Sequence, residues 1–298
     1  MRMTRSTEPE KTDAAPRGDD GRRAPLVHKG VIITGAGAGL GRAYALACAA
    51  AGAGVVVNDI APEAAADTAA AIRAAGGEVV AAAGSVASWE VAEELTRLCA
   101  EHFGRVDGLV ANAGIMRTGA PWELDEATLR SVVEVNVLGV QFTARHALRA
   151  MVEDGGGGSV VTVVSGAQHG IPAMSAYGAS KGAVNAMTRN WALEGAPHRI
   201  RVNAVSPLGR TAMSALDLRD ERPDLPDPAH VAPLVVALLS DEAAGVSGRV
   251  IRFDGRLLGR YETGLHEIAE ADAWSADALV RALIADGTEE SGRPVRAG

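Results

Sequence analysis

From about residue 29 to residue 255, short apolar runs alternate with longer amphipathic segments that are rich in alanine. Short apolar runs are typical of strands buried on both faces of a parallel sheet, and the longer segments are typical of helices. The alternation predicts an α/β fold with a doubly wound parallel sheet of seven strands and helices on both faces. We expect strands at 30–34, 54–59, 78–83, 106–111, 158–164, 200–206 and 249–253, and helices at 40–52, 62–76, 88–103, 125–152, 175–195 and 229–240.

The two ends of the chain lie outside this alternation. Residues 1–28 are charged, contain proline and glycine and have few apolar positions, so we expect a disordered N-terminal tail. Residues 29–256 form the expected folded domain. Residues 257–298 form a C-terminal extension with a helical pattern at about 271–285, and covering a site or mediating assembly are both open roles for it. Residues 213–228 interrupt the alternation as either a lid or a plain surface loop.

Composition argues against several classes of function. The chain has 298 residues, 47% of them hydrophobic, a formal net charge of −8 and a pI near 5.4. This acidity disfavours non-specific binding to nucleic acids or anionic membranes. No apolar run is long enough to span a membrane, and no secretory signal is evident. Two cysteines, Cys48 and Cys99, suit a reducing compartment, so we expect a cytoplasmic location, and no ligand spacing predicts a metal site.

A glycine-rich loop, Thr34–Gly41, follows the first predicted strand and precedes a segment rich in helix formers. Glycines allow the backbone to approach a pyrophosphate, and the start of the next helix offers free N–H groups. The sequence therefore predicts a dinucleotide loop, although a plain turn in a glycine-rich chain is the alternative. The expected loop contacts are Gly35, Gly37, Gly39, Leu40 and Gly41.

An acidic residue, Asp59, ends the second predicted strand roughly 20 residues beyond the loop. A carboxylate there would accept hydrogen bonds from the ribose hydroxyls of adenosine and repel a 2′-phosphate. We therefore expect NAD(H) to be preferred over NADP(H), with Ile60 as a neighbouring contact. A capping role for Asp59 before Pro62 is the alternative, and the nearby Arg42 would tolerate a phosphate.

Tyr177 and Lys181 lie four residues apart on a predicted helix, and positions i and i+4 share a helical face. A nearby cation favours a phenolate and lowers the pKa of a tyrosine. The pair therefore indicates a general acid/base that exchanges a proton with an alcohol or a ketone.

Three further polar positions complete the candidate site. Asn112-Ala113-Gly114 closes the fourth strand, where small residues would let backbone lie against a cofactor. Ser165 follows the fifth strand and could donate a hydrogen bond to a carbonyl oxygen. Asn136 interrupts a helix, where asparagine is unfavourable and needs a local reason. A turn or helix irregularity is the simple alternative for each position taken alone.

Together these segments resemble the single-domain branch of the short-chain dehydrogenase/reductase family. They follow the family's order over about residues 29–255. The resemblance implies a Rossmann-type dinucleotide-binding and catalytic domain at 29–256. The matching segments are Thr34–Gly41, Asp59, Asn112–Gly114, Asn136, Ser165, Tyr177–Lys181 and Arg201–Pro207.

The resemblance assigns a role to each catalytic candidate. Tyr177 would be the acid/base, Lys181 would lower its pKa and hold the nicotinamide ribose, Ser165 would polarise the carbonyl, and Asn136 would hold a water in a proton relay. It also implies homotetramers or homodimers that pack through the two long helices. The implied cofactor contacts beyond the glycine loop are Asp59, Ile60, Ser85, Val86, Asn112, Ala113, Gly114, Tyr177, Lys181, Pro207, Leu208 and Thr211.

The chain departs from the family pattern in three places. Ser165 lies twelve residues before Tyr177 instead of the usual thirteen, Ser85-Val86 replaces Asp-Val, and Pro207-Leu208 replaces Pro-Gly. Thr211 would still reach the nicotinamide carboxamide. We interpret His169 as a solvated loop histidine. The expected substrate pocket, which suits a partly apolar substrate, comprises Ser165, Ala167, Pro172, Met174 and Leu208.

These observations predict an NAD(H)-dependent oxidoreductase that interconverts a secondary alcohol and a ketone of a small molecule. Hydroxyacyl thioesters, polyketide-like ketones and steroid- or terpenoid-like alcohols are all compatible substrates. Non-redox chemistry on the same fold, such as dehydration, epimerisation or cyclisation, is one alternative. A nucleotide sensor without turnover is another, although it would have no need of a tuned phenol.

Overall fold

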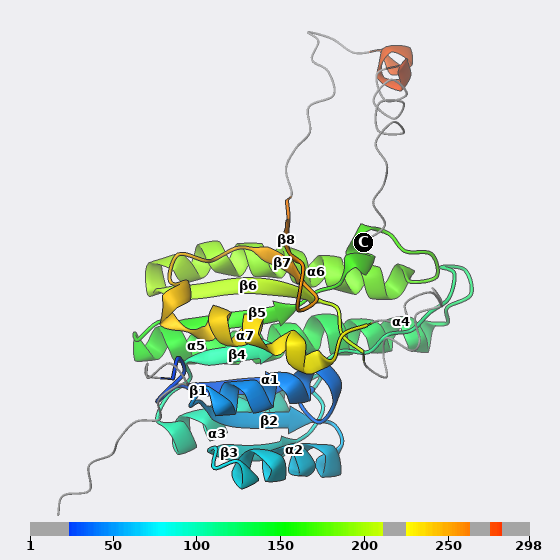
Figure 1. Cartoon of the computed structure of the whole chain (residues 1–298). Coiled ribbons are helices and arrows are strands. Elements are labelled where there is room, and N and C mark those ends of the chain that lie inside the picture. Colours follow the sequence, from blue (N-terminus) through cyan, green and yellow to red (C-terminus); the bar gives the residue numbers. More distant parts are fainter. Residues whose placement is uncertain (1–23, 211–224, 263–274, 282–298) are drawn as a thin grey trace, which may run out of the picture. The chain divides into compact units, whose positions relative to one another are not determined.

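A computed structural model describes residues 24–210, 225–262 and 275–281. The chain divides into two compact units, Met1–Tyr261 and Glu262–Gly298, and the first holds a single sheet (Figure 1). The sheet has the strand order β3-β2-β1-β4-β5-β6-β7-β8. Its strands are β1 Gly30–Thr34, β2 Gly54–Asp59, β3 Val79–Ala83, β4 Gly108–Ala111, β5 Gly158–Val163, β6 Ile200–Pro207, β7 Val250–Phe253 and β8 Leu258–Tyr261.

Strands β1 to β7 are parallel, which confirms the predicted doubly wound α/β class. The predicted number of seven strands is wrong, because β8 adds an antiparallel edge strand beside β7. The chain turns between them at Asp254, whose Oδ1 accepts hydrogen bonds from the backbone N–H groups of Arg256 and Leu257. Gly255 takes a φ of +89° in this turn, which favours glycine.

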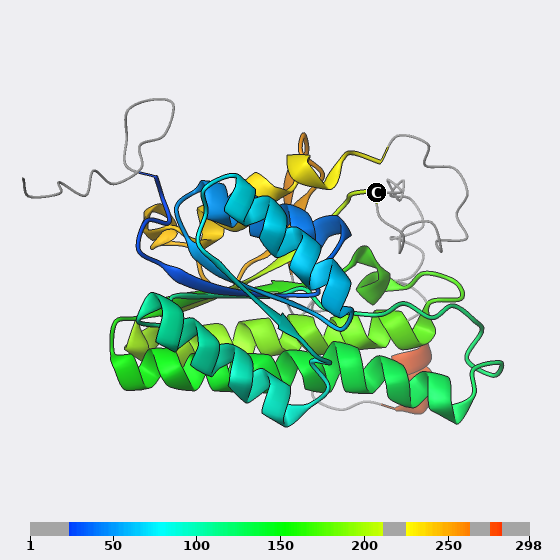
Figure 2. The ribbon, with the colours of Figure 1, turned by 90° about the horizontal axis from the view of Figure 1, so that it is seen from below.

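Helices cover both faces of the sheet (Figure 2). Alternate strand residues point to opposite faces, so Ile33 and Val57 pack with α1, α2 and α7, whereas Ile32 and Val56 pack with α3, α5 and α6. The helices are α1 Gly39–Ala50, α2 Pro62–Ala74, α3 Trp89–Phe103, α4 Glu126–Val133, α5 Gly139–Asp154, α6 Ser175–Gly195 and α7 Ala232–Leu239.

The predicted helix at 125–152 is continuous but contains one wider turn. Helices α4 and α5 are joined by a π-helical turn, η1 Glu134–Leu138, in which the N–H of Gly139 donates to the carbonyl of Glu134. Asn136 is fully buried inside this turn. The π-turn therefore explains why an asparagine lies inside this helix. Such turns are rare and are frequently found at functional sites.

The terminal segments differ from expectation where the structure describes them. Residues 24–28 of the predicted tail are ordered: Leu26 is fully buried and its N–H donates to the Ala51 carbonyl at 2.9 Å. At the other end, β8 lies beyond residue 256 and still belongs to the sheet. In the extension, residues 276–281 are helical. The rest of the tail, most of the extension and residues 213–224 of the interrupting segment lie outside the described residues.

Candidate active site

The carboxyl ends of the parallel strands lie at the right in Figure 1 and gather the candidate residues. The first group is the glycine loop between β1 and α1. Gly35 and Gly39 have φ angles of +61° and +53°, which glycine adopts without strain. A Cβ at Gly41 would lie 2.0 Å from the Gly35 carbonyl oxygen, so only glycine fits this close approach.

Hydrogen bonds fix this loop to the end of β4. The Asn112 Nδ2 donates to the carbonyls of Thr34 and Gly35, at 3.0 and 3.1 Å. In return, the Thr34 hydroxyl accepts from the backbone N–H groups of Asn112 and Ala113, both at 3.1 Å. The strand order turns at β1 and β4, where open α/β sheets bind their ligands. The side chain of Asn112 therefore acts as a brace for the loop.

The start of α1 suits a pyrophosphate. Its N-cap is Ala38, whose side chain makes no capping hydrogen bond. The first N–H groups of the helix consequently have no side-chain partner, and a phosphate would complement both them and the positive end of the helix dipole. The residues present thus fit a dinucleotide at this position.

Asp59 lies directly beside the loop. Its Oδ2 accepts from the Gly37 N–H at 2.9 Å and its Oδ1 accepts from the Ala61 N–H at 3.0 Å. Arg42 is turned toward α2, where its Nη1 donates to the Thr68 hydroxyl at 3.1 Å. A carboxylate, and not the guanidinium of Arg42, therefore stands at the end of β2.

The remaining cofactor candidates occupy the neighbouring strand ends. Ile60 is 73% exposed after β2. Ser85 accepts a hydrogen bond from the Ala87 N–H at 3.2 Å, and Val86 is buried against Gly139. Pro207 ends β6, and the N–H of Leu208 donates to the Phe253 carbonyl. Thr211 lies outside the described residues.

Tyr177 and Lys181 share the first half of α6 and are both buried. The Lys181 Nζ lies 5.6 Å from the centre of the Tyr177 ring and donates to the Val163 carbonyl at 2.8 Å. The end of β5 therefore holds the lysine beside the tyrosine.

Asn136 links this helix to the segment after β4. Its Oδ1 accepts from the Ile115 N–H, and its Nδ2 donates to the Ile115 carbonyl and to the Ser180 hydroxyl, at distances of 2.8, 2.8 and 3.0 Å. Ser180 in turn donates to the Tyr177 carbonyl at 2.7 Å. Both N–H bonds of the asparagine amide are therefore committed to protein groups.

Burial shifts the pKa values of both Tyr177 and Lys181. It raises the pKa of Tyr177, and a hydrogen bond with Ser165 acts in the opposite direction. It lowers the pKa of Lys181 to about 8. Removal of the phenolate from water is the largest contribution, so the net shift in the pKa of Tyr177 is upward.

Ser165 is the N-cap of a short 3₁₀ turn, η2 Gly166–His169, and its Oγ accepts from the Ala167 N–H at 3.2 Å. Its hydrogen bond with Tyr177 shows that the twelve-residue spacing still brings the two hydroxyls together. A small apolar cluster lies beside them and comprises Met116, Ala167, Met174, Tyr177 and the partly buried Ile171.

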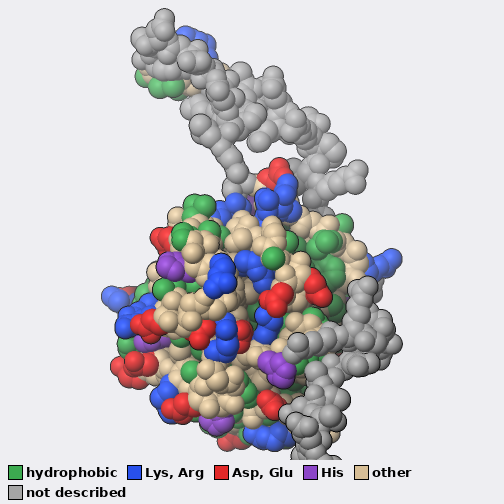
Figure 3. Space-filling view, turned by 90° about the vertical axis from the view of Figure 1, so that its left-hand side faces the viewer, with side chains coloured by type: hydrophobic (Ala, Val, Ile, Leu, Met, Phe, Trp, Pro, Cys, Tyr) green, Lys and Arg blue, Asp and Glu red, His purple; other side chains and the backbone are tan. Residues whose placement is uncertain are grey.

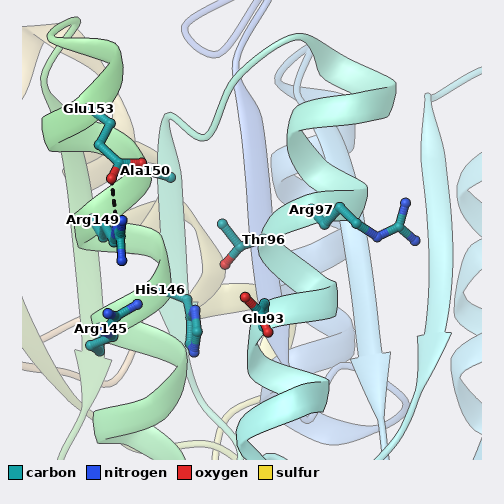
Figure 4. A pocket seen from close by; sticks show the side chains of 8 residues that line it. All are labelled: Glu93, Thr96, Arg97, Arg145, His146, Arg149, Ala150 and Glu153. Carbon is teal, nitrogen blue, oxygen red and sulfur yellow. Dashed lines mark hydrogen bonds and ion pairs between the residues drawn. The ribbon is translucent and has the colours of Figure 1, made fainter.

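Two other surfaces lie apart from this site. A cavity of about 320 Å³ between α3 and α5 is lined by charged side chains that include Glu93, Arg145 and Arg149 (Figure 4). The face at the amino ends of the strands carries interspersed acidic and basic side chains (Figure 3). Among the described residues no set of histidine, cysteine or acidic side chains is placed to hold a metal, and no described helix is long and apolar enough to cross a bilayer.

A family model described as short chain dehydrogenase matches residues 29–221. The chain belongs to this family. A relative, the cis-4-hydroxycyclohexanecarboxylate dehydrogenase of Sinomonas cyclohexanicum, is 37% identical over 236 residues, which cover 75% of this chain and 94% of the relative.

Solved short-chain dehydrogenases have the same fold. One from Mycobacterium avium has a TM-score of 0.80 and 35% identity, and the match covers 91% of this chain and 98% of that one. A carveol dehydrogenase from the same organism, solved in complex with NAD, has a TM-score of 0.72 and 26% identity, with 78% and 98% covered. The predicted family and the oxidoreductase class are therefore confirmed.

The structure brings most of the candidate residues together at the carboxyl ends of the strands. Ala167 and Met174 are in the apolar cluster, but Pro172 is exposed, and Leu208 is outside the cluster. Four further parts of the site were not predicted from the sequence: Met116, Ile171, Ser180 and the brace formed by Thr34. Of these residues, only Ser180 had a local signal in the sequence, because it lies within the Tyr177–Lys181 segment. The other contacts join segments that are distant along the chain.

Proposed function

We propose that this short-chain dehydrogenase interconverts a secondary alcohol and a ketone with NAD(H). The observation that carries the proposal is the buried cluster in which the Tyr177 phenol meets Ser165 and lies beside Lys181, at the same sheet edge as the glycine loop. When bound, the nicotinamide supplies or accepts the hydride. The protein supplies the proton and the polar groups that face the substrate oxygen.

Each side chain has a distinct task in this proposal. Burial raises the pKa of Tyr177 and so favours the protonated phenol, which donates its proton to the ketone oxygen during reduction. The Ser165 hydroxyl donates a hydrogen bond to the same oxygen. In the oxidation direction Tyr177 must first lose its proton, so alkaline pH favours alcohol oxidation.

Asn136 has a narrower role than the family pattern implies. Its amide N–H groups are both occupied by Ile115 and Ser180. A water in a proton relay would therefore be held by the second lone pair of Oδ1 or by the backbone carbonyl of this residue. The side chain itself positions the start of α6.

NAD(H) is the proposed cofactor, in preference to NADP(H). The Asp59 carboxylate at the end of β2 supports this choice, and Arg42 is engaged with Thr68. The NAD complex of the carveol dehydrogenase is further support.

A cyclic secondary alcohol or ketone is the proposed substrate. Two similar proteins are named for cis-4-hydroxycyclohexanecarboxylate and carveol, which both carry a hydroxyl group on a ring. The apolar cluster of Met116, Ile171 and Met174 beside Tyr177 suits such a ring. Hydroxyacyl thioesters are the competing class, and non-redox chemistry is the competing reaction.

A homodimer or homotetramer is the proposed assembly, in the cytoplasm. Exposed apolar side chains on α4 to α6, namely Leu129, Val133, Leu138, Val152 and Leu193, support packing of these helices against a second copy. The buried free thiols of Cys48 and Cys99 suit a reducing compartment.

The test is a turnover assay that follows nicotinamide absorbance with NAD(H) and NADP(H) in both directions. The panel comprises cyclic alcohols and ketones, steroids and hydroxyacyl thioesters, with Tyr177→Phe as the inactive control. Turnover of the cyclic class by the wild type is the expected result. Tight binding of NADH without hydride transfer to any compound would overturn the redox proposal and favour non-redox chemistry or sensing.

A further inference from the structure

The edge strand β8 places an aromatic ring against the segment that carries Ser165. Tyr261 is the last residue of β8 and lies opposite Val250 of β7. Residues directly opposite one another point to the same face of a sheet. Val250 is fully buried on the face covered by α6, so Tyr261 reaches that same face.

The contacts of Tyr261 lie in the short turn after Ser165. Its ring centre is 4.7 Å from that of His169, with 34° between the ring planes. Its hydroxyl is 3.5 Å from the position that a Cβ on Gly166 would occupy. The Tyr261 side chain therefore lies beside both ends of the η2 turn. His169 is exposed, as expected for a loop histidine, and its ring also packs against that of Tyr261.

A second anchor holds the same turn from α6. The Asn185 Nδ2 donates to Gln168 Oε1 at 2.8 Å, and the Arg189 Nε donates to Asn185 Oδ1 at 3.0 Å. The α6 backbone also approaches closely, since a Cβ at Gly178 would lie 2.5 Å from the Ala167 carbonyl oxygen. The turn is thus fixed by α6 through polar contacts and by β8 through an aromatic stack.

We propose that Tyr261 is a positioning residue for the Ser165 hydroxyl, so that this one side chain of β8 supports the active site. This inference rests on the proposed function. The Ser165 Oγ must point at both the Tyr177 phenol and the substrate oxygen, and displacement by about 1 Å of a group that orients the reaction can cost about 100-fold in rate. The stack on His169 limits that displacement.

Kinetics test the proposal with a matched set of variants. Tyr261→Ala should lower kcat about tenfold with KM and the Kd for NADH within about threefold of the wild type, and Tyr261→Phe should restore kcat because it keeps the stack. His169→Ala should reproduce the Tyr261→Ala effect. Leu258→Ala is the control, because Leu258 lies on the same strand but is 65% exposed.

A double-mutant cycle separates positioning from a general loss of structure. In a Ser165→Ala background, Tyr261→Ala should cause no further loss of kcat, since the group that it positions is absent. Losses that multiply in the double variant would overturn the proposal. So would unchanged kcat in Tyr261→Ala together with a lower melting temperature, which is the behaviour of a hairpin that only covers the sheet edge.

Hydrogen exchange provides a readout that needs no substrate. Tyr261→Ala should speed exchange of the amides at residues 166–170, whereas Leu258→Ala should not. Unchanged exchange in Tyr261→Ala would refute the positioning role even if the wild type proves inactive. An inactive wild type with faster exchange in Tyr261→Ala would refute the proposed function and leave the anchoring of this turn in place.

Discussion

The two halves of the site prepare for their ligands by different physical means. The half around β1, β2 and β4 relies on backbone shape: glycines at positive φ, an uncapped helix start and side chains such as Asn112 that brace the loop. The half around β5 and α6 relies on burial, which shifts the pKa values of Tyr177 and Lys181 in opposite directions. Substitutions in the first half should therefore damage binding, and substitutions in the second should damage proton transfer.

The largest effect is expected from removal of the phenolic hydroxyl. Tyr177→Phe should lower kcat at least about 1000-fold, since general acid/base catalysis typically contributes 100- to 10,000-fold. The Kd for NADH, measured by fluorescence titration, should stay within about threefold of the wild type, because the glycine loop is untouched. A comparable loss of cofactor affinity would break the division between the two halves.

Gly41→Ala, in contrast, should weaken binding of the cofactor. The new Cβ would meet the Gly35 carbonyl at 2.0 Å and the Asn112 Nδ2 at 2.5 Å, so the braced loop must deform. We expect the Kd for NADH to rise about 100-fold, which corresponds to about 3 kcal/mol. Gly245→Ala is the matched control, because a Cβ there meets nothing within 4 Å and the Kd should not change. Normal affinity in Gly41→Ala would show that the loop tolerates a wider turn.

The pH dependence of the unfolding free energy tests the half of the site around β5 and α6. Burial lowers the pKa of Lys181 from 10.5 to about 8. Between these values the unfolded chain binds a proton that the folded protein does not, so the free energy of unfolding rises with pH and the destabilisation is complete below about pH 8. The unfolding free energy of the wild type minus that of Lys181→Met should therefore increase by on the order of 3 kcal/mol from pH 8 to 10.5.

Urea unfolding of both proteins at several pH values measures this difference, and titrating groups that do not interact with Lys181 cancel. Parallel curves for the two proteins would mean that the folded lysine keeps an ordinary pKa.

The smallest effect is expected at the end of β2. Asp59→Asn keeps one acceptor for the Gly37 N–H but removes the charge that would repel a 2′-phosphate. The ratio of the Kd for NADPH to that for NADH should fall about tenfold, or about 1.4 kcal/mol. Asp67→Asn on the exposed side of α2 makes the same change in net charge and should leave the ratio unaltered. Equal ratios in both variants would remove Asp59 from cofactor selection.

The features that could be predicted from the sequence are the local ones. Short apolar runs located all seven parallel strands, and the family and fold class are confirmed. The eighth strand was not predicted, because Leu258–Tyr261 is short and has no apolar alternation of its own. It exists because β7 offers a free edge and Asp254 and Gly255 turn the chain back toward it.

The electrostatics of the site could not be predicted from spacing alone. The i, i+4 spacing of Tyr177 and Lys181 indicates proximity, but the direction of each pKa shift depends on how much water the surrounding chain removes. Likewise, Asn136 was identified as unusual in a helix, yet its partners Ile115 and Ser180 come from segments that only the tertiary fold brings together. The catalytic roles of these residues remain predictions.

The hairpin at the end of the sheet also bears on solubility. A free edge strand presents unpaired N–H and C=O groups that can recruit strands from other molecules, and short edge strands reduce this hazard. With β8 in place, the exposed edge is a four-residue strand that carries Arg260. A chain cut before Leu258 would instead present β7, with Val250, Ile251 and Phe253, as its outermost strand. A truncated chain must therefore keep residues 258–261 if this edge of the sheet is to stay protected against aggregation.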